Sequence, residues 1–114
     1  MKLIVTGHLG FIGSAFCHLY NDTYDITGID FKGWGALESN LAPGVRDLRA
    51  DIADAKAMHS IFEHVKPDAI VNFAAESHVD RSNEDDLCFW QSNVMGARAI
   101  ANQASRLGIR MVHV

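Results

Sequence analysis

The sequence contains few cysteines, no cluster of positive charge and no long apolar segment. Cys17 and Cys88 follow no disulfide or metal-binding pattern, and we find no signal peptide, so we expect a reducing, cytoplasmic environment. The formal net charge of -4 and the lack of a Lys or Arg run argue against nucleic acid or an acidic membrane surface as a partner. A nucleotide remains compatible with this charge, because backbone amides can bind its phosphates.

Histidine occurs six times, but without the spacing of a metal site. His59 and His64 lie five residues apart, which places them on different faces of a helix. We therefore predict no metal. The 114 residues, 48% of them hydrophobic, suit one globular domain and show no internal repeat, linker or low-complexity tail.

Three glycines, at positions 7, 10 and 13, follow a short apolar run at the start of the chain. This order predicts a strand, a phosphate-binding turn and the beginning of a helix. Gly7 can form the tight turn, Gly10 lets the backbone approach a pyrophosphate, and Gly13 lets the helix pack closely on the sheet. The alternative is an ordinary turn between a strand and a helix.

A carboxylate follows the second apolar run, at Asp30. It lies about as far after the first glycine as the acidic residue that accepts hydrogen bonds from the adenosine ribose in dinucleotide-binding folds. Its negative charge would repel a 2′-phosphate, which favours NAD over NADP. The alternative is a solvated strand end, but the combined glycine and carboxylate spacing favours a cofactor site.

Short apolar runs alternate with helical periodicity along the whole chain, which is typical of βαβ units around a parallel sheet. We predict an α/β, doubly wound, Rossmann-type fold of three αβα layers, with about five strands in the order 3-2-1-4-5. The strands are expected near residues 2–6, 25–29, 45–51, 68–73 and 110–114. Residues 32–44 form a polar connection, which would lie over the adenosine end of a dinucleotide.

The helix after the glycine turn is expected to bury one apolar stripe, with Cys17 on the same side as a core residue. The expected stripe consists of Ile12, Ala15, Phe16 and Leu19.

Two more helices are expected. The first is capped by Asp54, ends before Pro67 and buries Met58, Ile61, Phe62 and Val65. The second is expected to run from Ser82 to about Leu107, with Gly108 ending it. The residues expected on one side of this helix are Trp90, Val94, Ala97, Ala101 and Ala104. The acidic residues 84–86 suit the first turn of that helix, so we assign them a structural role.

Four segments make the interpretation more specific: Thr6-Gly7-x-x-Gly10-Phe11-Ile12-Gly13-Ser14, Asp51-Ile52, the run NFAAESHVDRS over residues 72–82, and Ser92-Asn93-Val94-x-Gly96. Together they resemble the extended short-chain dehydrogenase/reductase family, that of the NAD-dependent epimerases and dehydratases, over the whole chain. Within it the similarity is greatest to the nucleotide-sugar 4,6-dehydratases, lyases with tightly bound NAD. Such enzymes oxidise the sugar at C4, eliminate water and return the hydride to C6.

The resemblance implies an NAD site and one contact with a sugar substrate. The implied cofactor-binding residues are Gly7, Gly10, Phe11, Ile12 and Gly13 at the pyrophosphate, Asp30 at the ribose, Asp51 and Ile52 at the adenine, Phe73, Ala74 and Ala75 along the path to the nicotinamide, and Ser77 and Ser92 near it. Ser77 also matches a position that touches the sugar. His78, Asp80 and Arg81 match the motif, but a local ion pair with caps explains them better than catalysis.

The chain departs from the family pattern in two places. His8 and Leu9 stand where many relatives have smaller residues, and we expect these positions to face outward. The family's Ser-Thr-Asp-Glu segment and Tyr-x-x-x-Lys motif are absent, since neither Tyr20 nor Tyr24 has a Lys four residues later. We therefore predict no catalytic residue within 1–114 and no turnover by this chain alone.

Three interpretations remain open. Residues 1–114 are the NAD-binding domain of a nucleotide-sugar 4,6-dehydratase, truncated before its catalytic and sugar-binding regions. Alternatively, they form a stand-alone module for NAD or an adenine nucleotide, or one half of a split epimerase or dehydratase that needs a second chain. An open edge on the fifth strand would favour self-association or a complementary chain.

Overall fold

The chain forms a parallel sheet with helices on both faces. The computed structural model describes residues 1–31, 37–73 and 95–114. The elements in chain order are β1 (Lys2–Thr6), α1 (Phe11–Tyr20), β2 (Asp25–Asp30), the 3-10 helix η1 (Glu38–Asn40), β3 (Arg46–Arg49), α2 (Ala55–Val65), β4 (Ala69–Asn72), α5 (Gly96–Leu107) and β5 (Arg110–His113). The sheet order is β3-β2-β1-β4-β5, with every neighbouring pair parallel. The predicted fold class and strand order are confirmed.

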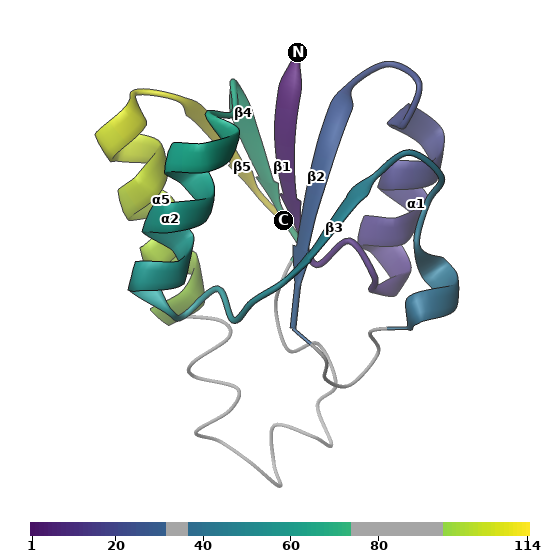
Figure 1. The fold of residues 1–114 in the computed structure, drawn as a ribbon, viewed down its shortest axis with the longest axis horizontal. Coiled ribbons are helices and arrows are strands. Elements are labelled where there is room, and N and C mark those ends of the chain that lie inside the picture. Colours follow the sequence, from purple (N-terminus) through teal and green to yellow (C-terminus); the bar gives the residue numbers. More distant parts are fainter. Residues whose placement is uncertain (32–36, 74–94) are drawn as a thin grey trace, which may run out of the picture.

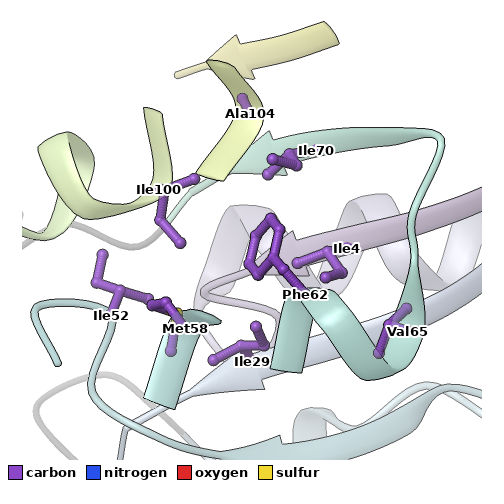
Figure 2. Packing of buried hydrophobic residues seen from close by; sticks show 9 residues of the cluster. All are labelled: Ile4, Ile29, Ile52, Met58, Phe62, Val65, Ile70, Ile100 and Ala104. Carbon is purple, nitrogen blue, oxygen red and sulfur yellow. The ribbon is translucent and has the colours of Figure 1, made fainter. Parts of the chain in front are cut away.

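Three layers are visible in Figure 1, with α2 and α5 on one side of the sheet and α1 on the other. Two apolar clusters fill the spaces between the layers. The cluster beneath α2 and α5 includes Ile4 and Ile70, which are register partners on β1 and β4 (Figure 2). The cluster beneath α1 includes Leu3, Val5 and Cys17. Because side chains alternate along a strand, β1 supplies both clusters.

Helix α2 follows the sequence closely. The Asp54 carboxylate accepts a hydrogen bond from the Ala57 amide at 3.2 Å, which caps the helix as predicted. Met58, Phe62 and Val65 are buried, and Ile61 packs against the same cluster. The helix ends at Val65, and Lys66 at its C-cap adopts a left-handed conformation with φ 52°.

Helix α1 contradicts the predicted stripe. Ile12 and Leu19 are 60% and 74% exposed, Ala15 is exposed, and Phe16 is half-buried. Its buried residues are instead the small ones, Gly13, Ser14 and Cys17. The cause is close packing: a Cβ on Gly13 would lie 2.0 Å from the Gly7 carbonyl oxygen, so the helix turns its smallest side chains toward the sheet. Cys17 is a core residue, as predicted, and burial raises the pKa of its thiol to about 11.

Helix α5 buries Ala104, as predicted, but Ala97 and Ala101 of the expected side are not buried. Ile100, Gln103 and Ala104 are buried, whereas Ala101 is exposed and Ala97 is half-buried. Ile100 is larger than the alanines of this helix, and its side of the helix therefore packs toward Met58 and Ile70 (Figure 2). Gly108 ends the helix with φ 66°, as predicted. The expected helix start at Ser82, together with Trp90 and Val94, lies outside the described residues.

Among residues 1–31, 37–73 and 95–114, no helix has the length and apolar character needed to cross a membrane.

Candidate functional site

The glycine turn connects β1 to α1 at the carboxyl edge of the sheet. Gly7 has φ 77°, a left-handed conformation that favours glycine, and its amide donates to the Ile29 carbonyl at 2.8 Å. The Gly10 amide then donates to the Gly7 carbonyl at 3.1 Å, which closes the turn. A Cβ on Gly10 would have that oxygen at 3.4 Å, an ordinary contact, so Gly10 is not required by the packing of the turn itself.

The first turn of α1 has backbone donors available for an anion. Its N-cap, Gly10, makes no side-chain capping bond, and the first amide bonded back along the chain is that of Ser14, to the Gly10 carbonyl at 2.9 Å. The preceding amides therefore point from the positive end of the helix dipole without an intrahelical acceptor. Phe11 is 89% exposed, so its side chain does not cover this end. The uncapped turn fits a pyrophosphate.

Asp30 lies beside this turn, at the end of β2. One carboxylate oxygen accepts from the Leu9 amide at 2.9 Å, and the other accepts from the Phe31 amide at 2.8 Å. Burial raises the pKa of Asp30, and these two amides act in the opposite direction. Each oxygen of a carboxylate can accept a second hydrogen bond, so Asp30 retains capacity for ribose hydroxyls. The Asp30 carboxylate thus lies next to the glycine turn, and its ribose contact stays a prediction.

The expectation that His8 and Leu9 face outward is wrong. Their exposed fractions are 1% and 0%, so both side chains are buried within the sheet edge. The His8 ring lies over Gly28 of β2, where an added Cβ would be 2.2 Å from the ring Cγ. His8 Nε2 lies 2.7 Å from Oδ1 of Asp47 on β3. The His8 ring fits there because Gly28 has no side chain. The spacing of residues in the sequence does not reveal this contact.

Asp51 and Ile52 follow β3. Asp51 Oδ1 accepts from the Ala53 amide at 2.9 Å, which orders the turn before α2. The side chain of Ile52 is 6% exposed and packs in the core beside Met58 (Figure 2). Ile52 therefore has a role in core packing, which was not predicted. The adenine contacts of Asp51 and Ile52 stay predictions.

Phe73 follows β4, next to β1. Its amide donates to the Thr6 carbonyl at 2.9 Å, and its ring lies 5.5 Å, centroid to centroid, from that of Phe16 on α1. Its cofactor contact stays a prediction. The four remaining predicted site residues, Ala74, Ala75, Ser77 and Ser92, lie outside the described residues.

A row of polar residues, missed by the sequence interpretation, crosses three strand ends from a buried pair to the exposed His113. Thr6, Asn72 and His113 are register partners on β1, β4 and β5. The Thr6 hydroxyl and the Asn72 carboxamide oxygen are hydrogen-bonded, and Asn72 Nδ2 lies 2.8 Å from His113 Nδ1. Thr6 and Asn72 are fully buried. The signal was available, because a polar residue ends each of these three strands.

The described part of the chain contains no group of three or more His, Cys, Asp or Glu side chains arranged to hold a metal ion.

Comparison with known proteins shows which family the chain belongs to. The model of the "NAD dependent epimerase/dehydratase family" matches residues 3–114. The chain is 40% identical over 111 residues to dTDP-glucose 4,6-dehydratase 1 of Escherichia coli, covering 91% of this chain and 31% of that protein. These matches confirm the resemblance that the sequence motifs indicate.

Solved structures agree with this result. DesIV, a dTDP-glucose 4,6-dehydratase of Streptomyces venezuelae whose crystal structure contains NAD, superposes with a TM-score of 0.84 at 36% identity, covering 99% of this chain and 38% of DesIV. UDP-glucose 4-epimerase of Thermotoga maritima gives a TM-score of 0.91 at 24% identity, with 99% of this chain and 37% of that one covered, which supports the fold. The chain spans about a third of the length of these proteins.

Proposed function

Because the chain belongs to the NAD dependent epimerase/dehydratase family, we propose that the carboxyl edge of its sheet binds NAD through the glycine turn and Asp30. The observation that carries this proposal is the uncapped N-terminus of α1 beside the Asp30 carboxylate. The free amides of the first turn bind the pyrophosphate, and Asp30 accepts hydrogen bonds from the adenosine ribose. A 2′-phosphate would meet the same carboxylate, so NAD is bound in preference to NADP.

The finer proposal is that residues 1–114 are the NAD-binding domain of a nucleotide-sugar 4,6-dehydratase. The similarity to dTDP-glucose 4,6-dehydratases supports this assignment. Bound NAD supplies hydride acceptance and return in such a reaction. This chain contributes the adenosine and pyrophosphate contacts, and Ser77 is proposed to contact the sugar. Because the Tyr-x-x-x-Lys motif is absent from these residues, we expect no turnover without further residues.

The outer strand favours a second chain as an alternative. In the described sheet β5 is the last strand, and Val112 on it is 50% exposed. An unpaired strand edge can pair with another chain. Self-association, or association with a polypeptide that carries the catalytic residues, is therefore proposed beside a stand-alone binding module. Sedimentation of the purified chain separates these states.

Calorimetric titration with NAD, ADP-ribose and NADP tests the cofactor proposal. We expect NAD and ADP-ribose to bind with similar affinity, because the adenosine and pyrophosphate groups make the contacts, and NADP to bind more weakly. Asp30→Ala should weaken NAD binding by about 1–3 kcal/mol, the cost of losing a half-buried charged acceptor. Asp25→Ala is the matched control, since Asp25 begins the same strand and its side chain is 47% exposed. Absence of binding by all three ligands would contradict the proposal.

A further inference from the structure

The His8 side chain is buried in the glycine turn, yet the cofactor contacts proposed above do not use it. Its ring lies over Gly28 of β2, and its Nε2 is directed at Asp47, the register partner of Gly28 on β3. A histidine with 1% exposure must be matched by neighbouring polar groups, because an unpaired buried polar group is costly. Asp47 supplies one such match.

The hydrogen bond between His8 and Asp47 has a defined direction. Asp47 is held by Arg49, whose Nε lies 3.0 Å from Oδ1 and whose Nη2 lies 2.9 Å from Oδ2. These bonds lower the pKa of Asp47, so its side chain is a carboxylate that only accepts. His8 Nε2 therefore donates. His8 Nδ1 is buried and has no hydrogen-bond partner among the described residues, so the bond to Asp47 is the one that orients the ring.

The backbone of Leu9, the next residue, is held by other parts of the chain. The Leu9 amide donates to Asp30, and the Leu9 carbonyl accepts from Asn40 Nδ2 at 3.0 Å and from the Leu37 amide at 3.2 Å. The backbone between Gly7 and Gly10 is thus fixed at His8 by β3 and at Leu9 by β2 and the segment at η1. The glycines give this stretch little stiffness of their own.

We infer that His8 is a positioning residue for a pyrophosphate-containing ligand: its hydrogen bond to Asp47 fixes the turn from Gly7 to Gly10 and thereby the free amides at the start of α1. This inference rests on the proposed function. It assigns to Asp47, on a neighbouring strand, an indirect effect on ligand affinity. Preorganised donors bind an anion more tightly than donors that must be ordered on binding.

Two pairs of variants test the inference. His8→Gln retains a donor at a similar reach, whereas His8→Asn is too short to reach Asp47. On β3, Asp47→Asn retains an acceptor and Asp47→Ala removes it, at a half-buried position that tolerates change better than His8. Arg49→Ala is the control for the loss of the Arg49 bonds. Affinity is measured by titration with ADP-ribose, which contains the pyrophosphate, and with adenosine, which lacks it, and folding is followed by thermal unfolding.

We expect His8→Asn and Asp47→Ala to bind ADP-ribose about tenfold more weakly, the effect of one hydrogen bond, with the affinity for adenosine unchanged. His8→Gln, Asp47→Asn and Arg49→Ala should stay close to the original chain. Equal affinity of Asp47→Ala and the original chain for ADP-ribose would overturn the inference, as would a parallel loss for both ligands. If the original chain binds neither ADP-ribose nor NAD, the proposed function fails first, and the inference with it.

Discussion

Replacing Gly13 by alanine tests how closely α1 approaches the turn. The added Cβ would lie 2.0 Å from the Gly7 carbonyl oxygen and 2.8 Å from its carbonyl carbon. Both are backbone atoms, and the turn cannot easily recede because the Gly7 amide is bonded to Ile29 across the sheet at 2.8 Å. Overpacking of this kind costs about 3 kcal/mol, and the better helix propensity of alanine returns about 1 kcal/mol.

The net loss of about 2 kcal/mol corresponds to a fall in Tm of about 8 °C for a chain of this size. Gly10→Ala is the matched control in the same turn, because its Cβ would make only the 3.4 Å contact and its φ of -77° suits alanine. We expect its free energy of unfolding to stay within about 0.5 kcal/mol, while its affinity for ADP-ribose falls because the methyl group occupies the space before the amides. Urea unfolding measures both variants. Equal stability of the two would refute the close approach of α1.

Three further outcomes are expected. Both C-caps are left-handed, with φ 52° at Lys66 and 66° at Gly108, a conformation that favours glycine. In chemical unfolding, Lys66→Gly should therefore stabilise the chain and Gly108→Ala should destabilise it, each by about 1 kcal/mol. Effects of the same sign would contradict this reason. Cys17 should resist iodoacetamide at pH 8 until the chain unfolds, as followed by peptide mass spectrometry, because burial raises the pKa of its thiol to about 11. The Arg49 bonds lower the pKa of Asp47 below its ordinary 3.8, so the stability it contributes is present above that pH and is lost as the pH falls below it. The unfolding free energy of Asp47→Asn should therefore fall less steeply in acid than that of the original chain, and parallel pH profiles would argue against the ion pair.

The strands could be predicted because the sequence signal of each one lies within its own segment of the chain. A parallel strand inside a sheet produces a continuous apolar run, as at residues 69–71, and α2 combines a cap with regular apolar spacing. The right-handedness of βαβ units then leaves few arrangements for five such strands. The glycine turn and Asp30 were found for the same reason, since both lie at strand ends with characteristic spacing.

Two of the errors, in α1 and at His8, have a different cause, which is close packing against the backbone of a glycine. Apolar spacing in α1 favours burial of Ile12 and Leu19, but the contact of Gly13 with Gly7 fixes the rotation of the helix and turns these residues to solvent. The burial of His8 likewise depends on the missing side chain of Gly28, on a strand distant in sequence. A pattern of apolar residues does not show which way a glycine faces, so these two glycine contacts could not be predicted from it.

The position of β1 in the middle of the sheet has a consequence for synthesis. This strand pairs with β2 on one side and with β4 on the other, and Thr6 meets Asn72 only after 66 more residues have been made. At ribosomal rates of about 5–20 residues per second, the β4 side of β1 waits roughly 3–13 s for its partner. During that interval the nascent chain exposes an apolar strand edge, which makes it a candidate client for chaperones that bind extended apolar segments.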